Sequence, residues 1–421
     1  MEVKLGYKQT EVGVIPEDWG VSTVGREFEI KLGKMLDAEK NVGVPKPYLG
    51  NKAVQWDRID HSDLPTVPMT RADIERFRLR KGDLLVCEGG EVGRAALWNA
   101  PIEECYYQKA LHRLRPLRGF DSRLMVALLR EWSDRGLLTN YVTQTSIAHL
   151  PREKFVEVPM PVPPLPEQRA IATALSDVDA LLGALDRLIA KKRDLKQAAM
   201  QQLLTGQTRL PGFHGDWEVI QFTDLADKTR PWSIVGGPFG SNLKASDYTE
   251  EGVRIIQLQN IGDGRFLDNY AIYTSEAKAD ELLSNNIYPG EIILSKMGDP
   301  VARACRMPTT ARRYLMASDG IRLVVDPRQF DTRFVLEYIN SPYFRRRAIE
   351  SSTGSTRQRI GMEDLKRLPF VRPTLTEQTA IAAVLADMDA ELVLLEQRLA
   401  KTRALKQGMM QELLTGRIRL V

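Results

Sequence analysis

One stretch of sequence, present twice in the chain, decides the fold. Residues 165–210 read LPEQRAIATALSDVDALLGALDRLIAKKRDLKQAAMQQLLTGQTRL, and residues 375–420 read LTEQTAIAAVLADMDAELVLLEQRLAKTRALKQGMMQELLTGRIRL. The two copies align without a gap, and more than half of their positions are identical. Internal similarity of this strength indicates a duplication, so we interpret the chain as two half-molecules in tandem.

Both copies have the hydrophobic spacing of a long helix. Apolar residues recur at steps of four and three, the spacing of a coiled-coil seam. These seam residues are Ile171, Leu175, Val178, Leu182, Leu185 and Ile189 in the first copy, and Ile381, Leu385, Met388, Leu392, Leu395 and Leu399 in the second. Gly206 and Gly416 lie where left-handed helix caps are expected. Thr374 with Glu377 has capping-box spacing. Each helix of about 40 residues would be roughly 60 Å long.

The simplest arrangement pairs the two helices with each other, because their seam residues would otherwise face water. Antiparallel pairing is favoured, since it gives the two halves a pseudo-twofold relation. The alternatives are that each helix packs on its own domain or on a partner protein. The stretches IPEDW, ending at Trp19, and FHGDW, ending at Trp217, are similar. This similarity suggests a near-circular arrangement in which the C-terminal end returns close to the N-terminus.

The remaining parts of the chain have the pattern of mixed α and β domains. Apolar runs between glycines, at residues 82–90 and 290–299, predict buried strands. Residues 121–138 and 331–349 have helical spacing.

We therefore expect an α+β fold, a pseudo-twofold tandem repeat. In it, two mixed α/β globular domains are separated by two long antiparallel helices that form an intramolecular coiled coil. The predicted boundaries are 1–164 and 211–374 for the domains, and 165–210 and 375–421 for the helical spacers.

Composition fits a globular protein with a mildly basic surface. The 421 residues carry a net charge of +4, with 43% hydrophobic and 27% charged residues. That balance permits a nucleic-acid partner. The three cysteines are far apart and lack zinc-ligand spacing, so we expect reduced thiols and no metal. No stretch of about 18 apolar residues and no apolar signal segment occurs, which predicts a cytoplasmic protein without membrane contact.

Candidate contacts to DNA follow from side-chain chemistry. Arg and Lys suit guanine, Asn and Gln suit adenine, and hydroxyls and lysines suit phosphate. Glycine loops at residues 89–90, 236–241 and 262–264 would let backbone amides approach phosphate, although plain turn chemistry explains any one of them better. The candidates in the first domain are Asn51, Lys52, Gln55, Trp56, Gln144, Thr145 and Ser146. Those in the second are Ser241, Asn242, Lys244, Gln257, Gln259, Asn260, Ser355, Thr356, Arg357 and Arg359.

Motifs of catalysis are missing from the sequence. There is no GxxxxGK[ST] phosphate loop, no Asn-Pro-Pro-Tyr or Asp-Pro-Pro-Tyr tetrapeptide and no glycine-rich cofactor fingerprint after a strand. Glu291 and Lys296 are spaced poorly for a nuclease centre. We therefore expect a chain without catalytic residues.

The order of segments resembles the specificity subunit of type I restriction-modification systems. The motifs that carry the resemblance are PLPEQRAIATALSDVDALL, LKQAAMQQLLTG, TLTEQTAIAAVLADMDAEL and LKQGMMQELLTG, supported by VGVIPEDW, GGPFGSNLKASDY and GSTRQRI. The resemblance covers the full chain. The first domain departs from it, because it lacks the GPFGS and GSTR forms.

The resemblance implies a division of labour. Each domain would read one half of a split, asymmetric site in double-stranded DNA, and the helices would set the gap between the halves. Two modification subunits would carry S-adenosylmethionine and the adenine methylation chemistry. Restriction subunits would add ATP- and Mg²⁺-dependent translocation and cleavage. No cofactor is expected on this chain.

Three other interpretations stay open. The chain could serve a fused nuclease-methyltransferase that cuts on both sides of its site. It could be a helical scaffold that binds only proteins, in which case the two domains would share no basic, polar loop surface. It could be an enzyme with an unrecognised site, which predicts a deep pocket with perturbed carboxylates or histidines.

Overall fold

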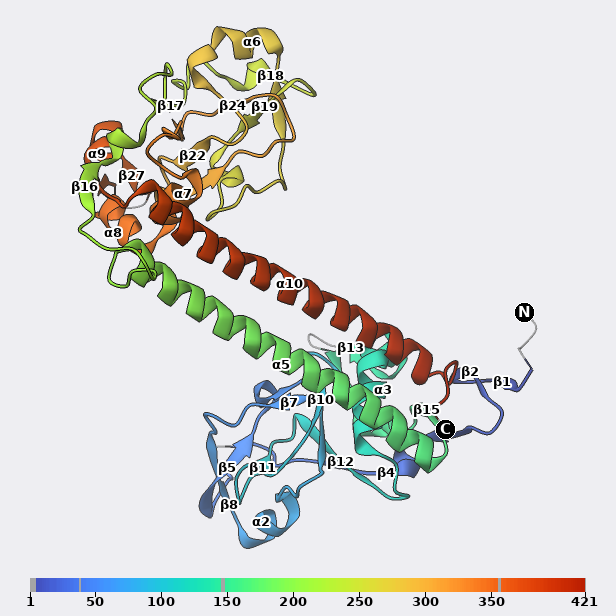
Figure 1. Cartoon of the computed structure of the whole chain (residues 1–421). Coiled ribbons are helices and arrows are strands. Elements are labelled where there is room, and N and C mark those ends of the chain that lie inside the picture. The colour runs from blue at the N-terminus through green and yellow to red at the C-terminus, as the bar shows by residue number, and fades with distance from the viewer. Residues whose placement is uncertain (1–4, 38, 145–147, 355–356, 421) are drawn as a thin grey trace. The chain divides into compact units, whose positions relative to one another are not determined.

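A computed structural model describes residues 5–37, 39–144, 148–354 and 357–420, excluding the side chain of Gln144. The chain divides into two compact units (Figure 1). Unit 1 comprises residues 1–186 and 397–421, and unit 2 comprises residues 187–396. Each unit therefore holds one globular domain with part of each long helix, and each is described by itself below.

Unit 1 is built around a four-stranded antiparallel sheet in the order β10-β9-β12-β4. Its strands are β4 (Phe28–Leu32), β9 (Leu84–Cys87), β10 (Ala95–Leu97) and β12 (Leu111–Pro116). A second sheet has the order β11-β5-β8, with β5 (Val44–Leu49), β8 (Thr66–Met69) and β11 (Tyr106–Tyr107). Four short pairs complete the unit: β1 (Tyr7–Thr10) with β2 (Gly13–Pro16), β3 (Gly20–Thr23) with β15 (Pro159–Val162), β6 (Val54–Gln55) with β7 (Arg58–Ile59), and β13 (Thr143–Gln144) with β14 (Ala148–His149).

Unit 2 repeats this plan. Its four-stranded sheet has the order β17-β25-β22-β23, formed by β17 (Ile234–Gly236), β22 (Ile292–Ser295), β23 (Ala304–Arg306) and β25 (Gly320–Leu323). A five-stranded sheet has the order β18-β20-β19-β24-β21, formed by β18 (Tyr248–Thr249), β19 (Val253–Ile256), β20 (Ile272–Thr274), β21 (Asn286–Ile287) and β24 (Tyr314–Met316). The remaining pairs are β16 (Glu218–Gln221) with β28 (Pro369–Arg372), and β26 (Ser352–Thr353) with β27 (Arg359–Ile360).

Strand register makes the two units comparable residue by residue. His112 of β12 lies opposite Val86 of β9, and Ile321 of β25 lies opposite Leu294 of β22. Since β9 and β22 are the strands predicted from the two glycine-bounded apolar runs, that prediction is confirmed. Their residues are all buried, as expected for strands at the centre of a sheet.

Short helices cover the sheets. They are α1 (Val24–Glu27), α2 (Arg71–Phe77), α3 (Ser122–Asp134), α4 (Arg152–Phe155), α6 (Glu276–Glu281), α7 (Thr332–Asn340), α8 (Pro342–Glu350) and α9 (Met362–Arg367). The helical spacing at 331–349 becomes two helices, because Pro342 cannot occupy a helix interior. Ser341 caps the second of them, donating from its hydroxyl to Tyr338 O and accepting from Phe344 N.

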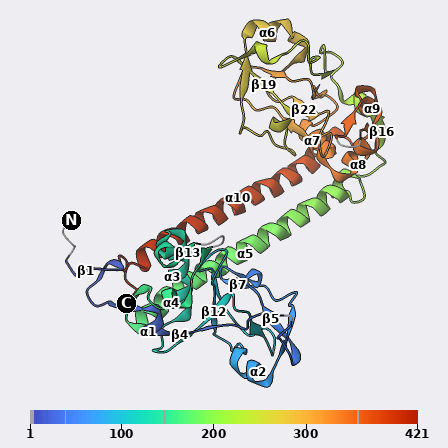
Figure 2. The same cartoon turned by 180° about the vertical axis from the view of Figure 1, so that it is seen from behind.

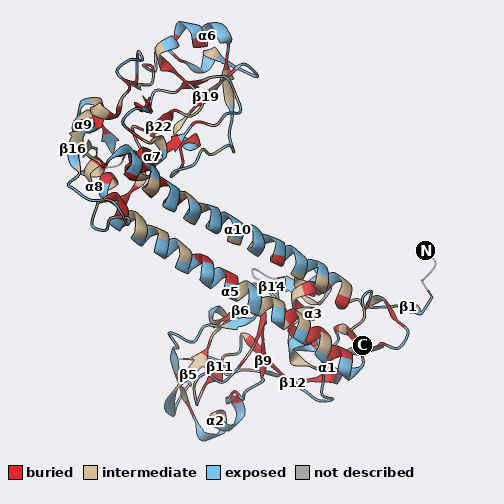
Figure 3. Ribbon diagram, viewed as in Figure 1, coloured by how far each residue is buried: buried red, intermediate tan, exposed pale blue. Residues whose placement is uncertain are grey.

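The two repeated stretches form α5 (Leu165–Leu204) and α10 (Leu375–Leu413), as predicted. Within each unit the two helices run side by side in opposite directions (Figures 1 and 2). In unit 2, Lys196 pairs with Asp389 at 2.6 Å and Lys192 with Glu391 at 2.7 Å. In unit 1, Lys406 pairs with Asp179 at 2.6 Å, the same contact shifted by the repeat. All twelve seam residues are buried or half-buried, whereas the outer helix faces are exposed (Figure 3).

A three-residue clasp closes the end of each helix pair. In unit 1, Glu167 accepts from Trp19 Nε1 at 2.9 Å and from Arg419 Nε at 2.7 Å. Glu377 does the same in unit 2 with Trp217 and Arg209, at 3.0 and 2.5 Å. The predicted return of the C-terminal segment to the N-terminal one therefore occurs, within unit 1. The predicted capping box at Glu377 is incomplete, because that carboxylate is engaged by the arginine.

Each unit has its own hydrophobic core, and each core includes the helix ends it contains. Gly206 and Gly416 adopt the predicted left-handed conformation, with φ of 72° and 68°. In the part of the chain that the structure describes, no helix has the length and apolar content needed to cross a bilayer.

Candidate nucleic-acid interface

The loops of unit 2 that carry predicted contacts meet at one end of its four-stranded sheet. Strand β17 ends at Gly236 and β22 ends at Ser295, and both lie beside the start of β25 at Gly320. The turn of residues 317–319, which we call the central turn of unit 2, precedes β25. Because these ends are neighbours in the sheet, the loops that leave them converge on this turn.

The glycine-rich loop is anchored on the central turn. Gly237 N donates to Gly320 O at 2.8 Å, and a Cβ at Gly237 would lie 1.8 Å from Ala317 O. Only glycine tolerates that approach. The amide of Gly237 is therefore engaged within the protein, which favours turn chemistry over phosphate binding at this position. Beyond it, Ser241, Asn242 and Lys244 are exposed.

The glutamine cluster begins at the same turn. Ala317 N donates to Ile256 O at 2.9 Å, so Gln257 starts beside the central turn. Gln257 and Gln259 reach solvent, and Gln259 Nε2 donates to Gln257 Oε1 at 3.1 Å. Asn260 is fully buried, and its amide donates to Leu267 O and Tyr270 O. In this conformation Asn260 supports the loop and offers no exposed polar atom for a base contact.

The third cluster of predicted contacts includes Arg357 and Arg359, late in the sequence of the second domain, and it also contacts the central turn. Ile360 N donates to Lys296 O at 3.0 Å, and Arg359 forms an ion pair with Asp319 of the central turn. Arg357 is exposed in the same loop. Ser355 and Thr356 lie outside the described residues.

Sequence reasoning missed two cations at this end of the sheet. Lys296 follows β22 directly, and its backbone N donates to Asp319 O at 2.7 Å. Arg303 ends the same loop, just before β23. One of its guanidinium nitrogens lies 3.5 Å from the point where a Cβ added to Gly298 would be. The signal that could have identified Lys296 is its position directly after a buried strand, two residues before Gly298.

Unit 1 has the same arrangement around residues 108–110, its central turn. Gly33 follows β4 as Gly237 follows β17, and a Cβ there would lie 2.3 Å from Tyr107 O. Asn51 and Lys52 begin the loop after β5, where Asn51 Nδ2 donates to Gly89 O at 2.9 Å. Gln108 N donates to Leu49 O at 3.1 Å, which holds this loop to the turn.

The other candidates of unit 1 are distributed differently. Gln55 donates to Lys52 O at 2.8 Å and stays in the loop. Trp56 packs against the core, with Arg130 4.9 Å above its ring and Glu91 accepting from its Nε1. Trp56 is therefore held against α3 through Arg130. His149 of β14 forms a β-bridge with Gly89. Thr145 and Ser146 lie outside the described residues, as does the side chain of Gln144.

The structure offers little for catalysis among the residues it describes. Burial raises the pKa of Cys87 to about 11 and those of Cys105 and Cys305 to about 12, so the thiols stay protonated near neutral pH. Thiols in that state are poor nucleophiles. Across the described ranges, no cluster of three His, Cys, Asp or Glu side chains is placed to hold a metal ion.

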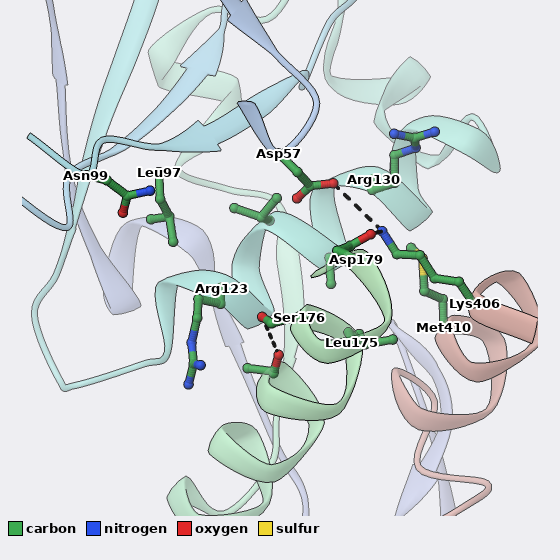
Figure 4. Close-up of a pocket in the computed structure, with 13 residues that line it drawn as sticks. Asp57, Leu97, Asn99, Arg123, Arg130, Leu175, Ser176, Asp179, Lys406 and Met410 are labelled. Carbon is green, nitrogen blue, oxygen red and sulfur yellow. Dashed lines mark hydrogen bonds and ion pairs between the residues drawn. The ribbon is translucent and has the colours of Figure 1, made fainter. Parts of the chain in front are cut away.

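One pocket of unit 1, of about 270 Å³, contains titratable groups (Figure 4). Lys406 Nζ lies 2.6 Å from Asp179 and 3.8 Å from Asp57. Burial raises the pKa of Asp57, and Lys406 opposes that shift.

A similar trio, one lysine between two carboxylates, occurs in unit 2. Its recurrence indicates a structural role. Lys196 Nζ there lies 2.6 Å from Asp389 and 3.8 Å from Glu337 of α7, a carboxyl whose pKa burial also raises. Each trio therefore attaches a globular domain to the paired helices of its unit.

Comparison with known proteins identifies relatives of this chain. Residues 16–191 match the family described as the type I restriction modification DNA specificity domain. The specificity subunit of type I restriction enzyme MjaVIII from Methanocaldococcus jannaschii is 24% identical over 424 residues, covering 96% of this chain and 94% of the relative. That of EcoKI from Escherichia coli is 19% identical, covering 97% and 90%.

Part of the chain thus matches the DNA specificity domain of type I restriction-modification systems, and relatives similar over nearly its full length are specificity subunits of such systems. Among solved structures, the S subunit from M. genitalium superposes with a TM-score of 0.55 at 17% identity, over 98% of each chain. At that identity the match establishes a shared fold. The family resemblance inferred from the repeated helices is thereby confirmed.

Proposed function

We propose that this chain reads a split, asymmetric DNA sequence, one half with each unit, and carries no catalytic site of its own. The observation that carries the proposal is the convergence of the three predicted residue clusters of unit 2 on one turn, with an equivalent turn in unit 1. Distant segments that present amides and cations at one place suit the reading of base edges and phosphates.

The loop sequences support unlike half-sites. Strand register makes Asn51 and Lys52 of unit 1 equivalent to Leu258 and Gln259 of unit 2. The loops that follow Gly33 and Gly237 also have little sequence similarity. Because base preference depends on the side chains offered, two domains with different loops should prefer different bases.

The helices α5 and α10 are proposed to pair along their full lengths and to set the gap between the half-sites. The contact Lys196–Asp389 in unit 2 and its repeat Lys406–Asp179 in unit 1 have matching register, as a pseudo-twofold coiled coil requires. Half-sites about one helical turn apart, roughly 34–36 Å, would lie on the same face of the duplex.

Catalysis is assigned to partner subunits. Modification subunits, two per chain, would hold S-adenosylmethionine and methylate adenine, and restriction subunits would use ATP and Mg²⁺. Among the described residues, the buried carboxylates of Glu167, Glu291 and Glu377 are engaged in ion pairs with arginines, which fits a positioning subunit.

The test is selection of DNA from a random duplex library. The chain is purified with the modification subunit encoded beside it, and bound duplexes are sequenced. We expect two unlike half-sites separated by a fixed gap, with affinity that falls steeply as salt rises, since phosphate contacts dominate binding. Enrichment of no sequence by a soluble complex would contradict the proposal and favour a protein-binding scaffold.

A further inference from the structure

Each unit exposes one large apolar side chain two residues beyond its anchored glycine. Phe239 follows Gly237 and is 82% exposed, and Met35 follows Gly33 and is 64% exposed. Phe and Met are residue types usually buried in folded proteins. Isolated exposed apolar residues are common, but these two occupy the same register position in loops of different sequence.

The backbone holds each side chain out from the turn. Gly237 is fixed at the central turn of unit 2, and Asn242 N donates to Phe239 O at 2.8 Å, which closes the loop behind the ring. In unit 1, Lys34 N donates to Tyr107 O and Lys109 N donates to Lys34 O, both at 2.9 Å. The anchor lies two residues before Phe239 in unit 2 and one residue before Met35 in unit 1, so the position of each apolar residue relative to the turn is constrained.

The surroundings identify the partner. Lys296 and Arg359 contact the central turn on which the loop of Phe239 is anchored, and Lys244 lies five residues beyond Phe239 in the chain. In unit 1, Lys34 directly precedes Met35 and Lys109 lies in the central turn, where its backbone N donates to Lys34 O, although the Lys34 side chain is paired with Asp73 at 2.9 Å. An exposed apolar side chain in a loop anchored at a turn that also carries cations complements a duplex, whose phosphates attract the cations while its base stack accepts an apolar group.

We propose that Phe239 and Met35 are wedges that insert against a base step, one in each half-site, and partly unstack it. The inference rests on the proposed function. Pyrimidine–purine steps unstack most readily, so the wedges would add a preference for such a step at positions without a direct hydrogen bond.

The experiment uses the chain in complex with its modification subunit and the duplex that this complex selects. A fluorescent adenine analogue, 2-aminopurine, is placed in turn at each step of both half-sites, and affinity is measured in parallel. The wild-type complex should raise the fluorescence at one step in each half-site. Phe239→Ala should remove the signal in one half only and weaken binding about tenfold or more.

Matched variants separate the wedge from general effects. Met35→Ala should remove the signal in the other half, and Phe239→Leu should retain part of the first. Val219→Ala trims another side chain of unit 2, 67% exposed and outside these loops, and should change neither measurement. Sequence-specific binding that persists with unchanged affinity and fluorescence in Phe239→Ala overturns the wedge alone. Absence of specific binding by the wild-type complex overturns the proposed function on which it rests.

Discussion

At the residue scale, burial decides which of the candidate side chains have polar atoms free to contact DNA. Asn260 has the amide that suits adenine, yet it is buried by the loop it supports. Trp56, also predicted as a contact, is half-buried against the core and stacks with Arg130 of α3. Local sequence gives residue type, whereas burial depends on segments that are distant in the chain. The exposure of Phe239 likewise depends on distant segments and could not be predicted from local sequence.

Gly237 provides a sharp test of the anchored loop. Gly237→Ala places a methyl group against Ala317 O, a backbone atom that cannot yield alone. We expect the loop to shift and specific binding in one half-site to weaken about tenfold, or about 1.4 kcal/mol. Gly240→Ala is the control, because a Cβ there meets nothing within 4 Å. Equal affinities of the two variants for the selected duplex would argue against the anchor.

His112 should make the stability of the first domain pH-dependent. Its ring is buried, its Nε2 donates to Leu150 O at 2.8 Å, and burial lowers its pKa from 6.5 to about 4. The unfolded chain therefore binds more protons between these values, so stability is complete above pH 6.5 and declines as pH falls toward 4. The expected loss over this window is about 3 kcal/mol.

The check is the free energy of unfolding against pH for His112→Ile. Isoleucine is the natural choice because Ile321 occupies the same register position in unit 2. The variant should lose this part of the acid sensitivity. A pH profile parallel to that of the wild type would show that His112 is not its source.

At the element scale, the long helices were the most predictable part of the chain. Their seam spacing persists over some twenty residues, and no proline interrupts it. Shorter elements were harder to predict, as the break between α7 and α8 illustrates. The strand order of the sheets was beyond prediction, because pairing such as β4 with β12 joins residues far apart in sequence. That pairing is what brings the candidate loops together.

The clasp at the helix ends should matter far more than the exposed ion pairs along them. Glu377 is 1% exposed and serves both Arg209 and Trp217. Glu377→Gln should lower the free energy of unfolding by about 2–3 kcal/mol, since Arg209 would lose its charged partner. Glu391→Gln removes a surface partner of Lys192 and should cost under about 1 kcal/mol. Denaturant titration of both variants measures the difference, and equal losses would contradict the clasp.

At the scale of the whole molecule, the duplication was visible in the helices and largely hidden in the globular domains. In the globular domains the duplication is detected from strand register, which makes Gly33 equivalent to Gly237 and residues 108–110 equivalent to residues 317–319. Helix residues of both copies must satisfy the same packing, so they stay alike. The loops share only a backbone position, and their side chains differ, as the reading of two unlike half-sites would require.

The most direct measurement of the central claim is a map of methylated adenines in DNA from cells that co-express the chain with its modification subunit. We predict a split motif of two unlike halves with a fixed gap, and Arg357→Ala should relax one half by about 1–3 kcal/mol per affected base pair while the other half and the gap stay unchanged. Methylation that does not depend on the chain, or a change in both halves upon Arg357→Ala, would contradict the account.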